Sequence, residues 1–465
     1  MSDPLAPYDA LLLVSYGGPE GPDDVLPFMR NATKGAGIPD ERLLEVSGHY
    51  QRFDGVSPIN ACNRQLCEDL NERFAAAGSQ VRISLGNRNW HPYFAETLAE
   101  QIGGGARRIL TLFTTAYTSY SGCRQYRENL AAALEEVAAE QDISEVVLDR
   151  VRPFANTDGF IEANAEQIFA AWEDLGDKDG RVVLVTHSIP LSMARASGPQ
   201  PSMDAPATPA LFDSPRHCSS PSATSTTSSF QSRESELSQT FHSSLCEEDG
   251  TSDVAIAPAA DMSVREENAL SPAALSALLP ITREQNCLGE GWTYLAQHLA
   301  VGAAIMAKVS EKAGMEIPFD LAFCSRSGPP QAKWLEPDIN DHLVDLADRG
   351  VRSVVAAPIG FLSDHMEVVF DLDTGARETA EALGLNYRRA GTVGDSALMV
   401  DQLTELIFER AAQARGEQVD LPVAADTYPA WGENCGVNCC QYPRTRHRPT
   451  PNKLSTHNPI TTTKE

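Results

Sequence analysis

The sequence predicts an α/β protein made of two doubly wound, Rossmann-like halves with parallel sheets. Short runs rich in β-branched residues and leucine recur along the chain, and amphipathic stretches with helical spacing lie between them. The runs fall into two successive sets of similar size, which indicates two sheets. A length of 465 residues is sufficient for both. The candidate strands are residues 10–14, 81–85, 108–113, 145–151, 182–186, 321–324 and 351–358.

The order of these elements gives the expected domain organisation. Residues 1–150 form the first half, and residues 151–198 together with 289–392 form the second. Residues 158–175 carry apolar side chains at helical spacing, which predicts an amphipathic helix early in the second half. Residues 393–442 are expected to form a C-terminal helix and a cysteine-rich extension. In such folds the ligand crevice lies at the carboxyl ends of the strands.

Two segments break the alternating pattern. In residues 199–288, an insertion, 21 of the 40 residues from 201 to 240 are Ser, Thr or Pro. This segment has too little periodic apolar surface to offset the entropy of ordering, so we predict that it is disordered; an error in the gene model is the alternative. The tail, residues 443–465, is basic and aperiodic, and we expect it to be mobile.

Charge and apolar content exclude several classes of function. Asp and Glu number 64 against 37 Lys and Arg, so the formal net charge is -27, which repels nucleic-acid backbones and anionic lipid surfaces. No apolar run reaches the roughly 20 residues that span a bilayer. We therefore expect a cytoplasmic protein with no nucleic-acid partner and no membrane span. We also expect a monomer, although charge and apolar content do not fix the oligomeric state. Ten cysteines at irregular spacing favour free thiols and a metal site over a disulfide scaffold.

His187 follows the predicted strand 182–186 directly, in the run VVLVTHSIP. Its imidazole should therefore lie at the carboxyl end of a buried strand, where α/β proteins place their sites. An imidazole there can bind a transition metal or accept a proton near neutral pH. The alternative is a buried histidine that only satisfies a backbone carbonyl.

A second polar run follows the predicted strand 351–358 and opens a helix. Glu367 and Asp371 are four residues apart and so share one helix face, where two close carboxylates repel unless a cation or a proton lies between them. The alternative is capping of the helix start by Asp364 and its neighbours. Together with His187, these carboxylates predict a metal or acid–base site.

Tyr16 follows the first predicted strand and precedes two glycines and a proline, a turn that lets the backbone approach a ligand. The glycine-rich phosphate-binding motifs are absent, so nothing in the sequence supports nucleotide binding. Aromatic residues interleaved with Arg and Ser around residues 86–93 and 114–129 suit a flat, partly anionic ligand.

Five short segments follow one another along the chain: YGGP from Tyr16, SPIN from Ser57, VTHSIP around His187, SRSGPPQAKWLEPD from Ser325 and GFLSDHMEVVFDLD from Gly360. In this order they resemble the ferrochelatases, in particular the actinobacterial branch. The resemblance covers residues 9–198 and 289–442. It implies the chelatase fold, in which two Rossmann-like domains hold a porphyrin in the cleft between them, and a lyase that inserts Fe²⁺ into that porphyrin.

The resemblance to monoderm members of the family implies coproporphyrin III and ferrous iron as substrates and coproheme as the product, in heme biosynthesis. Two alternatives stay open, a protoporphyrin IX ferrochelatase and a tetrapyrrole-binding protein without catalysis. Related folds also insert cobalt or nickel into tetrapyrroles, and nothing in the residues alone fixes the number of propionates on the substrate.

The resemblance also implies roles for individual residues. His187 and Glu367 match the histidine and the acidic partner of the family's metal site, and would share iron binding and proton acceptance. Tyr16 matches a tyrosine on the opposite porphyrin face, which can become a ligand of the product iron. The positions that contact the porphyrin propionates correspond to Arg30, Ser57 and Tyr126.

Four cysteines match a quartet that binds a [2Fe-2S] cluster in the actinobacterial relatives: Cys123, Cys435, Cys439 and Cys440. Tetrahedral zinc is the alternative for four thiolates. The sequence departs from the family pattern after Asp371, where Gly375 takes the place of the next acidic residue on the helix. Glu378 is the candidate to replace it in an outer metal-delivery site.

Overall fold

The computed structural model describes residues 3–35, 37–143, 145–198, 293–327, 332–424, 439–442 and 460–461. The predicted insertion at 199–288, Cys435 and most of the predicted mobile tail lie outside the described residues. Within the described ranges, no helix is both long enough and apolar enough to cross a membrane.

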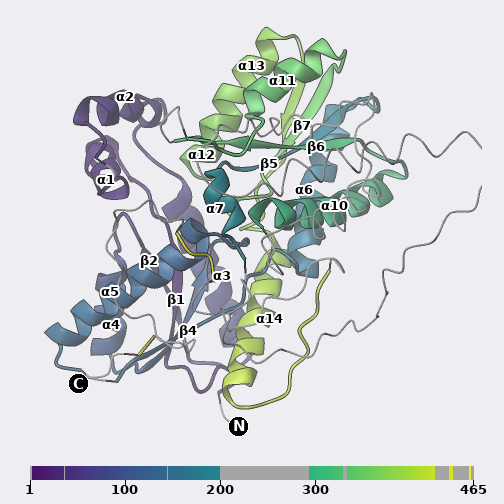
Figure 1. Cartoon of the computed structure of the whole chain (residues 1–465). Coiled ribbons are helices and arrows are strands. Elements are labelled where there is room, and N and C mark those ends of the chain that lie inside the picture. The colour runs from purple at the N-terminus through teal and green to yellow at the C-terminus, as the bar shows by residue number, and fades with distance from the viewer. Residues whose placement is uncertain are drawn as a thin grey trace, which may run out of the picture.

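The described strands form two sheets, as the sequence predicts (Figure 1). The first has the order β2-β1-β3-β4-β9 and is parallel except for the short β9. Its strands are β1 (Ala10–Ser15), β2 (Ile83–Asn87), β3 (Arg108–Phe113), β4 (Val147–Arg150) and β9 (Ile460–Thr461). β9 pairs antiparallel with β4, although the sequence shows no strand pattern in the tail.

The second sheet is parallel throughout, in the order β6-β5-β7-β8. Its strands are β5 (Arg181–His187), β6 (Phe319–Cys324), β7 (Ser353–Ala357) and β8 (Asn386–Arg389). The sequence did not predict β8, because its four residues are polar or aromatic and carry no β-branched run. Both sheets are parallel and flanked by helices, so the predicted fold class is confirmed.

Helices connect the strands. In the first half they are α1 (Val25–Ala32), α2 (Asp40–Gln51), α3 (Ile59–Ala76), α4 (Phe94–Gly103) and α5 (Gln125–Glu140). In the second half they are α6 (Asp158–Leu175), α7 (Leu191–Arg195), α10 (Tyr294–Ala313), α11 (Ile339–Asp348), α12 (Met366–Val369), the π-helix η4 (Asp371–Ala376) and α13 (Arg377–Ala382). The α6 bounds match the predicted helix.

The two halves share one core. Leu11 and Leu13 of β1 belong to the same buried cluster as Leu184 of β5, so one face of each sheet packs into the same hydrophobic core. Leu12 of β1 and Val185 of β5 point the other way and enter separate clusters on the outer faces. This alternation, with both faces buried, is what parallel strands covered by helices require.

The last long helix, α14 (Ala397–Ala414), also joins the halves, because it packs against α3 of the first and α6 of the second (Figure 1). The ring of Phe408 lies 6.2 Å from that of Phe74 on α3. Asp401 forms an ion pair with Arg73 of α3, with 2.7 Å between Oδ1 and Nε. The halves are therefore held by apolar and charged contacts from one element.

Gly360 brings the loop after β7 against the end of β5. Its backbone N–H donates to the carbonyl of Val185 at 3.2 Å. A Cβ at this position would collide with Oγ1 of Thr186 and lie 2.8 Å from its Cβ and 2.9 Å from its Cα. Only glycine fits here without moving one of the two backbones, and the loop continues directly to the helix start that the sequence marks as acidic.

We predict that Gly360→Ala destabilises the protein by about 1–3 kcal/mol, the usual cost of overpacking, because the added methyl group meets backbone rather than a mobile side chain. The matched control is Gly48→Ala in α2, where a Cβ meets nothing within 4 Å. Thermal melts of both variants check this. A Gly360→Ala melt equal to that of the wild type would contradict it.

Candidate active site

His187 and Glu367 meet at the carboxyl end of the second sheet. His187 is the last residue of β5, and Glu367 lies in α12, which follows β7. β5 and β7 are neighbours, so their carboxyl ends open on the same edge. The His187 Nε2 lies 3.3 Å from Glu367 Oε1, and the Nε2 of His365 lies 3.7 Å from the other carboxylate oxygen.

The backbone and a buried network orient His187. Its Nδ1 donates to the carbonyl of Ser188, which leaves Nε2 facing Glu367. Behind it, the hydroxyl of Tyr294 on α10 donates to the carbonyl of His187 at 3.2 Å. Thr186 Oγ1 lies 2.8 Å from the Nε2 of His298, which is fully buried. The end of β5 is thus fixed by side chains of α10.

The electrostatics make His187 and Glu367 an ion pair. Burial alone would lower the pKa of His187, but the charge of Glu367 and its hydrogen bond raise it to about 9. Burial alone would raise the pKa of Glu367, but the facing imidazolium holds it at about 2. Near neutral pH the pair therefore rests as imidazolium and carboxylate.

Asp371 behaves differently from Glu367. Burial raises its pKa to about 6, with a contribution from the negative charge of Glu367 and against a hydrogen bond from the hydroxyl of Ser325. Asp371 begins the π-helix η4, four residues after Glu367, as the sequence spacing predicts. One of the two close carboxyls therefore holds its proton more readily than the other, which is the expected response to their repulsion.

Two tyrosines of the first half face these acidic groups. Tyr16, directly after β1, is 37% exposed and packs edge-on against Phe28. Burial and the charge of Glu367 raise its pKa to about 12, against the opposing charge of Arg88. The pKa of Tyr50 on α2 is also raised, by burial and by the charges of Tyr16, Glu367 and Asp371. The sequence did not single out Tyr50, because nothing distinguishes it from an ordinary helix residue.

Ser57 supports the loop that carries Tyr16. It is 4% exposed, and its N–H donates to the carbonyl of Pro19 at 2.8 Å. A Cβ at Gly18 would lie 2.6 Å from the Cβ of Ser57. The amide of Asn60 donates to the Gly18 carbonyl at 3.0 Å. The YGGP and SPIN segments are therefore packed together, with Ser57 buried between them.

Arg30 and Tyr126 do not join this group. Arg30 on α1 is half-exposed and pairs with Asp40, with 2.6 Å between Nη2 and Oδ2. Tyr126 on α5 is 3% exposed and packs in the core of the first half, with ring centroids 5.6 Å from Phe113 and 6.3 Å from Phe94. Its burial leaves little ring surface for a substrate.

Helix α2 of the first half touches the acidic segment of the second. The ring of His49 stacks on Phe370 at 3.9 Å and 11°. Arg52 Nη2 lies 2.7 Å from Oε1 of Glu378. Glu378, which the sequence offers as a replacement beyond Gly375, is therefore already paired with an arginine of the opposite half.

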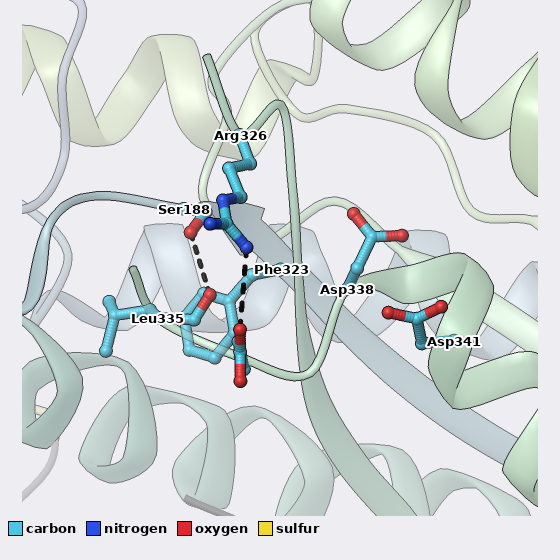
Figure 2. A pocket seen from close by; sticks show the side chains of 7 residues that line it. Ser188, Phe323, Arg326, Leu335, Asp338 and Asp341 are labelled. Atoms are coloured by element: carbon cyan, nitrogen blue, oxygen red, sulfur yellow. Dashed lines mark hydrogen bonds and ion pairs between the residues drawn. The ribbon is translucent and has the colours of Figure 1, made fainter. Parts of the chain in front are cut away.

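A small polar pocket lies on the other side of the β5 end (Figure 2). The hydroxyl of Ser188 donates to the carbonyl of Leu335 at 2.8 Å, and Arg326 forms an ion pair with Glu336 at 3.6 Å. Figure 2 shows Ser188, Arg326 and Leu335 lining the pocket. Asp338 and Asp341 also face it. Ser188 and Arg326 are thus bonded to other lining residues, Asp338 accepts from Asn340, and we assign the pocket no ligand.

Three of the four predicted cluster cysteines lie in one region. Cys123 is buried, and its sulfur accepts from Nη1 of Arg150 at 2.7 Å. The sulfurs of Cys439 and Cys440 are 3.7 Å apart, and Arg124, next to Cys123 in the chain, donates to the Cys439 carbonyl at 3.1 Å. Across the described ranges, which omit Cys435, no three His, Cys, Asp or Glu side chains are arranged to hold a metal ion.

Comparison with known proteins matches the family model "Ferrochelatase" to residues 8–248 and 279–411. The chain belongs to the ferrochelatase family. The resemblance inferred from the five sequence segments is thereby confirmed, and the ferrochelatases are metal chelatases of the lyase class. The His187–Glu367 pair is thus the candidate active site of a ferrochelatase.

Curated ferrochelatases match the chain over nearly its whole length. "Coproporphyrin III ferrochelatase" of Streptomyces coelicolor is 40% identical over 94% of this chain and 94% of that protein. The protein of the same description from Streptomyces griseus is 39% identical over 95% of each. A solved structure, "SirB from Bacillus subtilis with Fe3+", is 12% identical over 88% of this chain and 97% of that chain, with a TM-score of 0.38.

We predict that the imidazole of His187 titrates well above 6.5 and that Glu367→Gln brings its pKa down. Because the folded-state pKa is raised from 6.5 to about 9, the stabilisation is complete below 6.5 and is lost as pH rises towards 9. The pKa of Glu367 is lowered from 4.5 to about 2, so its share is present above 4.5 and is lost towards pH 2. NMR titration of labelled histidines measures the shift.

His298 is the internal control for this titration, because burial lowers its pKa to about 3 in either protein. Its signal should stay that of a neutral ring across the range. A His187 pKa near 6.5 in the wild type would contradict the ion pair.

Proposed function

We propose that the chain inserts Fe²⁺ into coproporphyrin III to give coproheme, with His187 and Glu367 as the groups that bind the metal and accept protons. The observation that supports this most is the 3.3 Å pair of an imidazole and a carboxylate at the carboxyl ends of β5 and β7. Tyr16 belongs to the first half, and the charge of Glu367 contributes to the raised pKa of its hydroxyl. A porphyrin between the halves would have one face towards each.

The reaction releases two protons, because the porphyrin loses two pyrrole N–H protons as its four nitrogens bind Fe²⁺. The site must therefore offer both a metal ligand and a base. A neutral imidazole is a suitable ligand for Fe²⁺, and a carboxylate can hold the metal or take a proton. His187 rests protonated beside Glu367, so it must give up that proton before its Nε2 can bind metal or act as a base. We assign the two roles to the pair jointly.

Asp371 suits the onward transfer of a proton. Its pKa of about 6 lies close to neutral, and it is four residues from Glu367 on the same helical segment. Tyr16 suits a different role. Its pKa of about 12 keeps the phenol protonated in the absence of metal, so it would have to lose that proton to bind the product iron as phenolate from the opposite face.

The coproporphyrin substrate is supported by the printed descriptions of the relatives that cover nearly the whole chain. Four propionates also offer more charge-assisted contacts than two. Arg30, whose half-exposed guanidinium is paired only with an exposed carboxylate, can exchange Asp40 for a propionate at low cost. Tyr126 is not part of this proposal, because it is buried in the core.

We predict that His187→Ala and Glu367→Gln each lower the rate of iron insertion by about a hundredfold to ten-thousandfold, the range for removal of a positioned base. Porphyrin affinity should change little, because hydrophobic walls and propionate contacts hold the macrocycle. Anaerobic insertion assays and porphyrin fluorescence titrations separate the two quantities.

The control for this pair is Arg349→Ala. Arg349 pairs with Asp345 of α11 at 3.0 Å, and both side chains are about one-third exposed or more. Activity of the His187→Ala protein above about a tenth of wild type would place the metal site elsewhere. Insertion of cobalt or nickel in preference to iron would indicate a different chelatase.

We predict a higher kcat/KM for coproporphyrin III than for protoporphyrin IX. Arg30→Ala should narrow this difference, because each hydrogen bond to a charged group contributes about 1.5–3 kcal/mol at most, and less at an exposed site. Arg42→Ala is the matched control, since Arg42 is an exposed arginine paired with Glu45 at 2.5 Å. Equal or reversed kcat/KM values in matched detergent would overturn the substrate proposal.

We further propose that Cys123, Cys435, Cys439 and Cys440 hold a [2Fe-2S] cluster, whose role would be to tie the C-terminal extension to the start of α5. Support comes from the buried Cys123, from the 3.7 Å approach of the Cys439 and Cys440 sulfurs, and from Arg124, which joins the two segments. The guanidinium of Arg150 also donates to the sulfur of Cys123 at 2.7 Å.

We predict that anaerobically purified protein carries two irons and two labile sulfides per chain, and that Cys123→Ser loses them. The visible absorption of the cluster should disappear with the metal. Cys62→Ser, at a thiol outside the quartet, should keep both. Stoichiometric zinc without labile sulfide would decide against the cluster.

A further inference from the structure

Arg389, the last residue of β8, binds two carboxylates with one guanidinium. Its Nε and Nη2 donate to the two oxygens of Asp373 at 2.9 and 2.8 Å. Its Nη1 and Nη2 donate to the two oxygens of Asp364 at 3.2 and 3.0 Å. The Arg389 side chain is 15% exposed, and the carboxylates are 27% and 24% exposed. Both contacts are therefore bidentate and largely shielded from solvent.

The two carboxylates flank the segment that carries the candidate active site. Asp364 precedes it, Asp373 lies within η4, and Glu367 and Asp371 stand between them. We call the contacts of Arg389 with Asp364 and Asp373 the clamp. The hydroxyl of Thr392 also donates to Asp364, at 3.0 Å. The hydroxyl of Tyr387 in β8 donates to the carbonyl of Leu372 at 3.1 Å. Strand β8 thus holds both ends of this segment from one side.

The segment needs support from outside because its own helical structure is weak. α12 spans four residues and passes into the six-residue π-helix η4, a geometry that occurs in short stretches only. Asp373 has one further arginine, Arg377, whose Nη2 is 3.9 Å away and whose Nε donates to the Asp373 carbonyl within the same helical segment. Only Arg389 links Asp373 to Asp364 through the contacts of the described residues.

We propose that Arg389 is a positioning residue for metal insertion, which fixes the carboxylate of Glu367 opposite His187 by clamping Asp364 and Asp373. This inference rests on the proposed function, because it takes Glu367 as part of the metal site. Arg389 acts through these two carboxylates and does not itself reach the reacting atoms. A planar guanidinium with five donors can satisfy both carboxylates at once, whereas the point charge of a lysine cannot.

The chain offers a matched control in the preceding residue. Arg388 also pairs with an aspartate, Asp174, but its side chain is 39% exposed and that of Asp174 is 70% exposed. Asp174 lies at the end of α6, away from the segment that carries Glu367. Arg388→Lys therefore makes the same change of side chain, one position away, without touching the clamp.

The experiment compares Arg389→Lys, Arg388→Lys, Glu367→Gln and the double variant Arg389→Lys/Glu367→Gln in anaerobic Fe²⁺ insertion into coproporphyrin III. Displacement of a reacting group by about 1 Å costs up to about a hundredfold, so we expect Arg389→Lys to lower kcat by tenfold to a hundredfold. Its porphyrin dissociation constant and Arg388→Lys turnover should stay at wild-type values. In the double variant, the loss should not exceed that of Glu367→Gln alone, because the clamp acts through that carboxylate.

Wild-type kcat in Arg389→Lys would overturn the inference, and so would losses that multiply in the double variant, which indicate a general structural role. If Arg389→Lys does not fold, Asp373→Asn replaces it: one arm of the clamp is weakened while Asp364 remains, and a smaller loss with the same non-additivity is expected. Full activity of Glu367→Gln would instead contradict the proposed function itself. If Glu367→Gln is inactive while Arg389→Lys and Asp373→Asn are fully active, the result contradicts only the inference about Arg389.

Discussion

The candidate site depends on one close backbone approach, that of Gly360 to the end of β5. Glu367 is seven residues further along the chain, so the loop from β7 can deliver it to His187 only if it passes directly over Thr186. On the other side, Tyr294 and His298 of α10 hold the same end of β5. The histidine is therefore fixed from two directions, and the position of the carboxylate follows from the path of a single loop.

The acidic side chains of this region lie next to two cationic ones, His187 and Arg389. The imidazolium of His187 faces Glu367, Asp371 holds a proton readily, and Arg389 compensates Asp364 and Asp373 further away. Glu367 has the imidazolium of His187 in contact, Asp364 and Asp373 share Arg389, and Asp371 accepts from the hydroxyl of Ser325. On the proposed function, a divalent ion that binds here would change this balance and favour release of the proton from His187.

The sequence predicted the sheets well and the site in part. Leucine- and valine-rich runs located seven of the strands, and the position of His187 after one of them placed it correctly, since the ends of parallel strands share an edge. β8 was missed because Asn386, Tyr387 and the two arginines that follow carry no strand pattern, and the clamp of Arg389 was missed with it. The proximity of Tyr50 to the acidic groups and the packing of Ser57 against the YGGP loop both depend on the tertiary fold of the first half, which local sequence patterns do not show. Arg30 and Tyr126 were grouped with Ser57 by resemblance, which does not report how buried a side chain is.

The packing of α14 has a consequence for how the chain reaches its folded state during synthesis. The residues that cover Phe74 of α3 belong to a helix that begins at Ala397, more than 300 positions later. Until that helix leaves the ribosome, the first half carries an uncovered apolar surface on α3, although all of its own sheet apart from β9 has already been made. The boundary between the halves, clear in the pattern of strands, is therefore not a boundary between units that complete their cores independently, and this nascent chain needs α14 before the apolar face of α3 is covered.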